Sequence, residues 1–424
     1  MGKLQRRVAL VGAGMSRFGV HYPKLRSIDL WQEAWLEAKK LTDKGIDSKD
    51  IDELFLGNFT ADLFNHQGHM APQMANLIGL NPKPASRFEG ACASSGIAFR
   101  QGVMSIASGV NDVVCVGGVE QMHELNTTGV TSALAAAADT TYEYYAGATF
   151  PGLYGAIANA HFHKYGTTSK DLMRIAIKDY ENGKHNPFAQ VQSTIPEVME
   201  KYRKRAAAKG QPEPDWKDEF DFLESSKNPL IAAPLRLYDC SLITDGAAML
   251  FLASEERAYD FTDEPLWISG IGQGSDSLSL HDRKDGAITS LQATKTAAET
   301  AYSMSGLTPK DIDLVEVHDC FTIAELIALE DLGFYQPGDA VKGIARGETR
   351  RDGKLPVNTS GGLKTKGHPV GATGAGQVVE IFKQLREYAE GERQVKKNLK
   401  AGMTHNLGGS GATAVVSIIT KEKI

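Results

Sequence analysis

The chain reads Gly45-Ile46-Asp47-Ser48-Lys49-Asp50-Ile51-Asp52 and then Leu54-Phe55-Leu56-Gly57, and this pattern occurs a second time far along the sequence. The second copy is Gly306-Leu307-Thr308-Pro309-Lys310-Asp311-Ile312-Asp313, followed by Leu314-Val315-Glu316-Val317. The two copies align without a gap, and each is typical of a helix end, a turn and then a strand. Such a repeat within one chain predicts two structurally related halves.

Two further pairs of segments support the duplication. Val8–Gly14 resembles Leu266–Gly272, and both are typical of a buried strand that runs into a glycine turn. If an insertion is allowed near 335–355, a helix beginning at Cys92 matches one beginning at His368, and a strand with glycines follows each helix. Pairwise similarity this low can arise by chance in an α/β chain. Three pairs in the same order favour a duplication instead.

Strands that alternate with helices predict α/β layers with buried sheets. We expect an N-terminal half over residues 1–265 and a C-terminal half over 266–424. The alternation breaks down between Gly118 and Asp245, where an alanine run and a highly charged, proline-containing stretch occur. We therefore expect an inserted segment over about 119–243 that carries helices of its own.

Composition narrows the class of protein. With 424 residues, 42% of them hydrophobic, the chain is too long for one ordinary domain. The net charge of −6 comes from mixed charges, which argues against a nucleic-acid partner. No apolar run reaches about 18 residues, so no membrane span is expected. Four widely spaced cysteines indicate neither a disulfide scaffold nor a zinc site, and we expect a reducing compartment, the cytoplasm.

Cys92 is the first candidate for chemistry. It stands in Phe88-Glu89-Gly90-Ala91-Cys92-Ala93-Ser94-Ser95-Gly96, where a strand is predicted to give way to a helix. A thiol at a helix start faces the positive end of the helix dipole, which favours the thiolate. The small neighbours leave room for a bulky thioester. The alternative is a buried structural cysteine, the commonest state of a free cysteine.

Two histidine motifs are the next candidates. Lys366-Gly367-His368-Pro369-Val370-Gly371-Ala372-Thr373-Gly374-Ala375-Gly376 has a proline just inside a predicted helix start, so His368 would lie near the N-cap. A neutral imidazole there could accept a thiol proton. His318-Asp319-Cys320-Phe321 lies at a predicted strand end. The alternatives are a glycine-rich packing turn for the first motif and ordinary core residues for the second.

The remaining motifs carry less information. His405-Asn406-Leu407-Gly408-Gly409-Ser410-Gly411 could direct backbone N–H groups at an oxyanion, or could be a tight turn between two strands. Gly12-Ala13-Gly14 fails as a dinucleotide-binding fingerprint because Arg17 occupies the third glycine position. We assign Cys115 to the core and give Cys240 no chemistry.

Together and in this order, these motifs resemble the thiolase family along nearly the whole chain. Gly90-Ala91-Cys92-Ala93-Ser94-Ser95-Gly96 is similar to the family's nucleophile motif, and Gly117–Met122 is similar to the strand that follows the nucleophile helix. Asp245-Gly246-Ala247-Ala248 resembles the segment where the family's loop domain rejoins the core. Gly367-His368-Pro369, with Gly371 and Gly374, is similar to its C-terminal histidine motif.

The chain departs from the common thiolase pattern at two positions. It has His318-Asp319-Cys320-Phe321 where most thiolases carry Asn-Glu-Ala-Phe, and Asn406-Leu407-Gly408 where they carry a second catalytic cysteine in Cys-x-Gly. The sterol-carrier-protein type and archaeal acetyl-CoA acetyltransferase branch shows the same exchange. The resemblance to that branch assigns the acid/base role to Cys320.

The resemblance implies a fold and a mechanism. The fold is two duplicated βαβαβαββ halves in a five-layer α-β-α-β-α core, with an inserted loop domain. In the implied Claisen condensation or its reverse, thiolysis, His368 takes the proton of Cys92 and the thiolate accepts an acyl group from an acyl-CoA. Cys320 then removes an α-proton from acetyl-CoA, while His318 and His368 stabilise the enolate oxygen. Backbone N–H groups of Cys92 and Gly408 would form a second oxyanion hole.

The resemblance also implies contacts and partners. Ser241 matches a family serine at the pantetheine arm, and Phe321 is expected at the substrate. The run Arg203-Lys204-Arg205 could meet CoA phosphates, although a solvated helix face is the preferred interpretation. No metal and no cofactor beyond the CoA thioester substrates are expected. We expect a homodimer or a dimer of dimers, and a zinc-ribbon/OB-fold partner, if one exists, would be a separate chain.

Other functions remain as alternatives. The thiolase fold also serves decarboxylating condensation, an HMG-CoA synthase-like step and retro-aldol cleavage. Cys92 argues against a lyase that forms no acyl-enzyme, and Cys320 argues for α-proton abstraction, which decarboxylation does not need. A non-catalytic acyl-CoA-binding protein would not need four chemical groups in these positions. The acyl group itself stays open among acetyl, branched, aromatic and steroid side-chain groups.

Overall fold

The computed structural model describes residues 4–284 and 287–424, so residues 1–3 and 285–286 of the two predicted halves lie outside the described residues. Up to residue 261, apart from a long excursion, the elements are β1 (Val8–Met15), α1 (Ser27–Lys40), β2 (Glu53–Gly57), α2 (Ala61–Phe64), α3 (Met70–Leu77), β3 (Ala85–Phe88), α4 (Ser94–Ala107), β4 (Val113–Glu120), β7 (Gly246–Ser254) and α10 (Glu255–Phe261). They are followed by β8 (Leu266–Ser275), α11 (Gln292–Ser305), β9 (Leu314–Glu316), α12 (Thr322–Asp331), α13 (Ala340–Ala345), α14 (Gly362–Thr365), α15 (Thr373–Leu385), β10 (Ala401–Gly408) and β11 (Thr413–Thr420).

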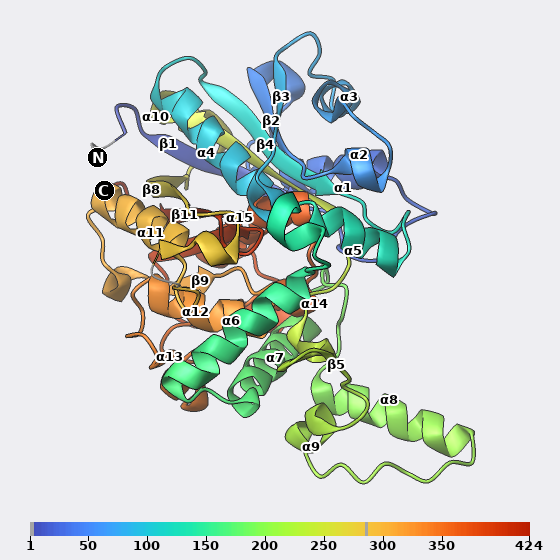
Figure 1. Cartoon of the computed structure of the whole chain (residues 1–424). Helices are drawn as coiled ribbons and strands as arrows, with labels where there is room; N and C mark the ends of the chain where they lie inside the picture. Colours follow the sequence, from blue (N-terminus) through green and yellow to red (C-terminus); the bar gives the residue numbers. More distant parts are fainter. Residues whose placement is uncertain (1–3, 285–286) are drawn as a thin grey trace.

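The excursion between β4 and β7 is mostly helical. It contains α5 (Thr127–Ala135), α6 (Phe150–Tyr165), α7 (Ser169–Lys184), α8 (Ile195–Ala208) and α9 (Glu219–Glu224), and a small hairpin of β5 (Leu230–Ala232) and β6 (Leu235–Arg236). α8 and α9 project from the rest of the chain (Figure 1). The bounds 119–243 for an inserted domain, and 265/266 between the halves, stay predictions. Among the described helices, not one has both the length and the apolar character to cross a membrane.

Within the described residues, nine strands form one sheet in the order β3-β2-β4-β7-β1-β8-β11-β10-β9. The order places β1 and β8, the first strand of each predicted half, side by side in the middle. They pair antiparallel through Ala9 with Trp267 and Leu10 with Leu266. This short ladder joins two groups of strands edge to edge, so the sheets of the two halves are continuous.

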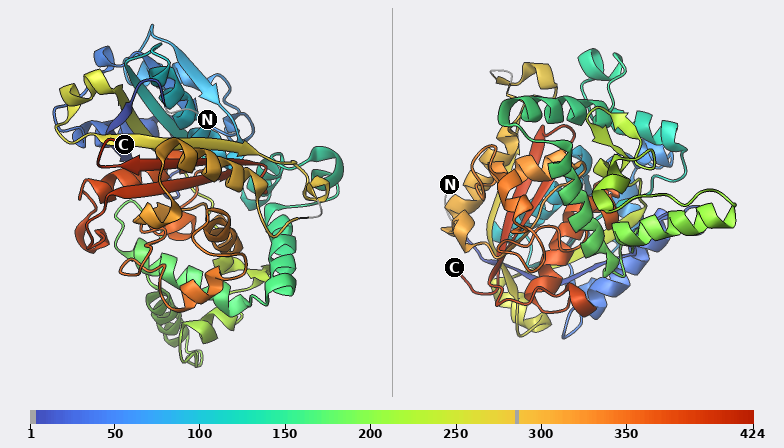
Figure 2. Two further views of the ribbon diagram at one scale, coloured as in Figure 1. Left: turned by 90° about the vertical axis from the view of Figure 1, so that its left-hand side faces the viewer. Right: turned by 90° about the horizontal axis from the view of Figure 1, so that it is seen from below.

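Helices cover this sheet in three layers. α1 and α10 pack on β1 and β7, and α11 packs on β8 and β11. α4 contacts β4 from the first group of strands and β8 from the second, and α15 contacts β1 from the first group and β10 from the second. Both helices therefore lie between the two groups of strands. In Figure 1 the blue and cyan elements lie above and the orange and red elements below, and the left-hand view of Figure 2 shows the same arrangement from another side. The α/β fold with two related halves in five layers is confirmed.

The two copies of the repeated motif adopt the same local structure. Gly45 and Gly306 both have positive φ, 79° and 73°, which reverses the chain after a helix. In the short turn that follows, the backbone N–H of Asp47 donates to the Asp50 carboxylate, and that of Thr308 donates to the Asp311 carboxylate. β2 and β9 begin directly afterwards. The predicted order of helix end, turn and strand is confirmed in both copies.

The first turns of α4 and α15 approach each other more closely than side chains would allow. A Cβ atom on Gly374 would lie 2.6 Å from the backbone nitrogen of Gly96 and 2.3 Å from Oδ1 of Asn406. A Cβ atom on Gly96 would lie 2.6 Å from the same Oδ1. Real Cβ atoms do not approach other atoms so closely, so both helix starts need glycine at the contact.

We predict that Gly374→Ala lowers the free energy of unfolding by about 1–3 kcal/mol, because the added methyl group must displace backbone and Asn406 in a close-packed interior. Gly152→Ala in α6 is the matched control, since the nearest atom to its new Cβ is Thr149 Oγ1 at an ordinary 3.6 Å. The control should be neutral or stabilise by up to about 1 kcal/mol. Urea unfolding followed by circular dichroism measures both, and equal midpoints would contradict the close helix contact.

Candidate active site

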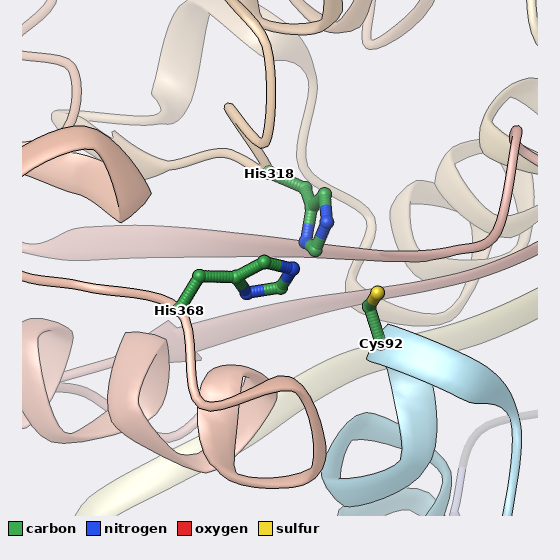
Figure 3. A group of neighbouring side chains, drawn as sticks. All are labelled: Cys92, His318 and His368. Carbon is green, nitrogen blue, oxygen red and sulfur yellow. The ribbon is translucent and has the colours of Figure 1, made fainter. Parts of the chain in front are cut away.

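Cys92 lies in a tight turn between β3 and α4, just before the helix begins. Ala91 has a φ of 51°, a left-handed conformation that costs a non-glycine residue about 1–3 kcal/mol. The hydroxyl of Ser94 donates to the carbonyl oxygen of Ala91 at 2.6 Å and accepts from the backbone N–H of Gly90 at 3.1 Å. These bonds hold the turn, which presents the thiol to two histidines (Figure 3).

His368 lies in the loop before α15, and its neighbours decide which ring nitrogen carries the proton. Its backbone N–H donates to Thr244 Oγ1 at 2.9 Å. Nδ1 lies 2.7 Å from Thr373 Oγ1, and that hydroxyl donates its single hydrogen to the carbonyl of Pro369 at 3.1 Å. The hydroxyl must therefore accept a hydrogen bond from Nδ1–H. Nε2 is left unprotonated and free to act as a base.

His318 follows β9 and is connected to Cys92 through Asn406 on β10. The Asn406 amide nitrogen donates to the carbonyl oxygen of Cys92 at 2.9 Å and lies 3.4 Å from Nδ1 of His318. Asn406 Oδ1 accepts from the backbone N–H of Gly96 at 3.2 Å. One side chain thus connects the nucleophile turn, the start of α4 and the loop after β9.

The three groups meet at one point. The thiol sulfur of Cys92 and a ring nitrogen of His318 and of His368 all lie within 4.8 Å of one another. The two imidazole rings are 5.0 Å apart at their centres and nearly perpendicular, at 80°. Figure 3 shows the thiol pointing toward both rings. A thiol beside an imidazole with a free ring nitrogen is the arrangement for nucleophilic catalysis.

A cavity of about 150 Å³ opens at this point and is lined mainly by apolar side chains. Its walls include Cys92, Cys320, Phe321, His368 and Ser241, so the fold brings these predicted site residues together. The backbone N–H of Ser241 donates to the carbonyl of Cys320 at 2.8 Å. A larger, more polar cavity of about 510 Å³ lies beside Lys178 and Arg350 and contains none of these groups.

The family model "Thiolase, N-terminal domain" matches residues 8–256, and "Thiolase C-terminal domain-like" matches residues 272–421.

The chain belongs to the thiolase family.

This thiolase is similar to an acetyl-CoA acetyltransferase of Methanothermobacter thermautotrophicus, with 41% identity over 98% of this chain and 100% of the relative. It is 31% identical to human sterol carrier protein 2 over 97% of this chain and 71% of that protein. Among solved structures, it is similar to an Ltp2-ChsH2(DUF35) aldolase, with 26% identity, a TM-score of 0.77 and coverage of 99% and 100% of the two chains. The predicted resemblance to the sterol-carrier-protein and archaeal branch is confirmed. The protein is an acyltransferase of the thiolase type.

Burial keeps both thiols of this thiolase protonated. It raises the pKa of Cys92 to about 12, opposed by a hydrogen bond from the backbone of Gly409. Burial likewise raises the pKa of Cys320 far above its usual range, with the neighbouring Cys92 adding to the shift and a hydrogen bond with Tyr154 opposing it. The thiolate predicted from the helix start is therefore wrong for the free enzyme, because loss of water outweighs the helix dipole.

Both imidazoles are neutral for a related reason. Burial lowers the pKa of His368 to about 3, and the positive charge of Lys366 adds to the effect. Burial, with His368 and His405 as neighbours, also holds the pKa of His318 well below its usual range. The neutral imidazole predicted for His368 is present, but its cause is burial and a nearby ammonium group. The N-cap of α15 is Ala372, so His368 lies before the helix proper.

Three residues add to or alter the predicted site. Gly409, one residue beyond the predicted Gly408, is the glycine whose backbone contacts the Cys92 thiol and lines the cavity. Gly408 is the last residue of β10, paired with Thr413. The sequence marks Asn406 as the residue in place of the second catalytic cysteine, but its contacts with Cys92 and His318 appear only in the folded chain. Tyr154, which lines the cavity, carries no sequence signal that would have identified it.

Among the residues that the structure describes, two groups of side chains have donor atoms close enough to hold a cation. A soft divalent ion such as Zn²⁺ suits the set Cys92, His318 and His368. Asp179, Asp319 and Glu325 form the second group. There the ammonium of Lys178 already lies 3.1 Å from Asp179 Oδ1 and 2.5 Å from Glu325 Oε1. A lysine thus supplies the positive charge, and the prediction that the enzyme needs no metal stays a prediction.

We predict an unusual pH dependence for alkylation of Cys92 by iodoacetamide. Only the thiolate reacts, and below its pKa the thiolate fraction rises tenfold for each pH unit. With the pKa raised to about 12, the rate should climb without a plateau from about pH 7 to about pH 9.5. The same assay on urea-unfolded chain is the control, and its rate should level off near the ordinary thiol pKa of about 8.5. Peptide mass spectrometry measures both, and a plateau below about pH 9 in the folded enzyme would show a preformed thiolate.

Proposed function

We propose that the enzyme catalyses a reversible Claisen condensation between an acyl-CoA and acetyl-CoA through an acyl-Cys92 intermediate. The observation that carries this proposal is the meeting of Cys92 with two neutral imidazoles at a cavity whose wall also holds Cys320. One thiol is needed to hold the acyl group, and a second to move the α-proton. The other thiols are Cys115 in the buried strand β4 and Cys240, which the proposal does not use.

In the first half-reaction, Nε2 of His368 takes the proton of Cys92 as the sulfur attacks the thioester carbonyl. The bond between the carbonyl carbon and the CoA sulfur breaks, and the departing CoA thiolate takes the proton back from His368. The negative oxygen of the tetrahedral intermediate needs donors, and backbone N–H groups of the Cys92 turn and the Gly408–Gly409 turn are the proposed oxyanion hole. Because His368 starts uncharged, it can accept the proton.

In the second half-reaction, the Cys320 thiol gives its proton to solvent, and the resulting thiolate removes an α-proton from acetyl-CoA. His318 stabilises the enolate oxygen through its Nε2–H, since its Nδ1 faces the Asn406 amide donor. His368 can do so only in the form that carries a proton on Nε2. The enolate carbon attacks the acyl carbonyl, the bond to Cys92 sulfur breaks, and the proton held by Cys320 passes to Cys92. Cys92 is then a thiol again and Cys320 regains a proton from solvent, so protons balance over the cycle.

The substrate assignment rests on similarity and on the cavity. The name of the methanogen relative, acetyl-CoA acetyltransferase, supports acetyl-CoA as a substrate. The cavity of about 150 Å³ supports a short acyl group, and its apolar walls include Val130, Leu134 and Phe150. Ser241 and Phe321 line the same cavity, which supports their proposed contact with substrate. Arg203-Lys204-Arg205 lies on the projecting helix α8, outside that lining.

A retro-aldol lyase is the second candidate, because the chain is similar to a solved structure named as an aldolase. An aldol cleavage needs no acyl-enzyme, so a thiol beside two imidazoles favours the acyltransferase. That solved structure also names a second protein, ChsH2(DUF35), and on this ground we propose that a separate small protein can bind this chain. We further propose a homo-oligomer, cytoplasmic location and catalysis without a cofactor other than the CoA thioesters themselves.

We predict that Cys92→Ala abolishes acyl-enzyme formation, because it removes the sulfur that holds the acyl group. Intact-mass spectrometry after incubation with acetyl-CoA should show one added acetyl group on the wild type and none on the variant. Cys115→Ala, in the buried strand β4, is the control and should acylate normally. Acylation of Cys92→Ala at the wild-type level would move the nucleophile elsewhere, and an unacylated wild type would favour the lyase.

We predict that Cys320→Ala separates the two half-reactions. The variant should still form the acyl-enzyme, since that step uses Cys92 and His368. Exchange of the acetyl-CoA α-protons with deuterated solvent should fall by about 10²–10⁴-fold, the usual contribution of a general acid–base group. Deuterium incorporation is measured by mass spectrometry beside the acylation assay. Near-normal exchange would exclude Cys320 as the base.

A further inference from the structure

Arg283 is a buried arginine that the sequence did not single out. It follows the short turn Leu280–Asp282 between β8 and α11, and it is 3% exposed. A guanidinium group is costly to bury unless its N–H groups find acceptors. Nη2 of Arg283 donates to the carbonyl oxygen of Ser410 at 2.7 Å and to the hydroxyl of Ser410 at 3.3 Å. The arginine therefore binds the turn that contains Ser410.

This turn, residues 408–411, follows β10 and lies at the wall of the active-site cavity. Gly409 and Gly411 have positive φ, 60° and 104°, and the N–H of Gly411 donates to the carbonyl oxygen of Gly408 at 3.1 Å. Gly409 lines the same cavity as Cys92. Glycines leave a turn free to change shape. Bonds from outside the 408–411 turn must therefore decide where its backbone N–H groups point.

A charged bond holds the 408–411 turn from outside, and a neutral bond assists it. The hydroxyl of Tyr154 donates to the carbonyl oxygen of Gly409 at 3.1 Å. The bond from Arg283 to Ser410 is shorter and involves a charged donor, and such bonds are roughly twice as strong as neutral ones. Within the described residues, the carboxylate that approaches Arg283 is Asp276, whose Oδ2 lies 4.0 Å from Nε. The short contact of the guanidinium is with the turn, which brings a positive charge close to the proposed oxyanion hole.

We propose that Arg283 is a positioning residue that fixes the 408–411 turn and so aligns the backbone N–H groups that stabilise the oxyanion during acyl transfer to Cys92. The inference rests on the proposed oxyanion hole. Arg283 does not touch the acyl group and acts only through the turn. The enolate of the second half-reaction is stabilised at His318, in the loop after β9, so removal of the α-proton by Cys320 does not depend on Arg283.

Arg283→Met tests the proposal, because methionine fills much of the same space but has neither the charge nor a donor. The maximal rate of Cys92 acetylation should fall by about 10- to 100-fold, the usual loss for a hydrogen bond that involves a charged group. The acetyl-CoA concentration that gives half this rate, and α-proton exchange of acetyl-CoA, should both stay within about threefold of the wild type. Arg283→Lys keeps the charge but lacks the planar fork, and its acetylation rate should fall by only about three- to tenfold.

Arg386→Met is the matched control. Arg386 is also buried, at 8% exposed, and its Nη2 donates to a carboxylate oxygen of Asp43 at 2.8 Å, away from the active-site lining. The variant loses a charged bond of the same kind, so acetylation and exchange should both stay within about threefold of the wild type. Intact-mass spectrometry over time measures acetylation, deuterium incorporation measures exchange, and circular dichroism checks that each variant is folded.

The pattern of losses separates positioning of the turn from a general structural role. Equal losses in acetylation and exchange would overturn the inference, and so would a loss confined to the half-saturating acetyl-CoA concentration. Acetylation of Arg283→Lys no faster than that of Arg283→Met would also overturn it. If Arg283→Met does not fold, Arg283→Lys alone tests the split between acetylation and exchange. If the wild type forms no acyl-enzyme, the proposed function fails. If the wild type is acetylated and Arg283→Met is acetylated at the same rate, only the role of Arg283 fails.

Discussion

The contact between the first turns of α4 and α15 is the constraint on which the site depends. Gly96 and Gly374 let the two helix starts touch, and Asn406 fills the remaining space while accepting the Gly96 N–H. The strand β4 approaches the turn before α15 just as closely, because a Cβ atom on Gly118 of β4 would lie 2.2 Å from the carbonyl oxygen of Gly371. Because Cys92 and His368 directly precede these two helix regions, the helix contact sets the distance between nucleophile and base.

Burying the helix starts between two groups of strands has an electrostatic consequence. Two thiols and two imidazoles are held uncharged in a space with little water, so charge develops only when substrate is present. The loop that carries His368 needs support in this environment, and it comes from a buried ion pair between Lys366 and Glu316, at 3.4 Å. Lys366 therefore both anchors the loop and disfavours protonation of His368.

Sequence alone predicted what is repeated or local, and missed what depends on contact. Both copies of the repeat, the layers and the motifs around Cys92, His318, Cys320 and His368 follow from patterns within short segments. No local sequence pattern predicts that β1 pairs with β8, because the two buried strands are joined through only two residue pairs. Asn406 is 314 positions away from Cys92, and only the folded chain brings them to 2.9 Å. The thiolate was mispredicted because a sequence shows a helix start but not the burial around it.

The excursion between β4 and β7 was the least predictable part of the chain, and it has the most to do with substrate. Its residues follow no repeat, yet Val130, Leu134 and Phe150 from α5 and α6 form much of the apolar cavity wall, and Tyr154 lines the same cavity. The duplicated layers hold the reacting groups. Every thiolase that uses this mechanism needs these same groups. A change of acyl group needs only a change in the walls. Substitutions in α5 and α6 can therefore alter which acyl group fits while the helix contact that holds Cys92 and His368 together stays intact.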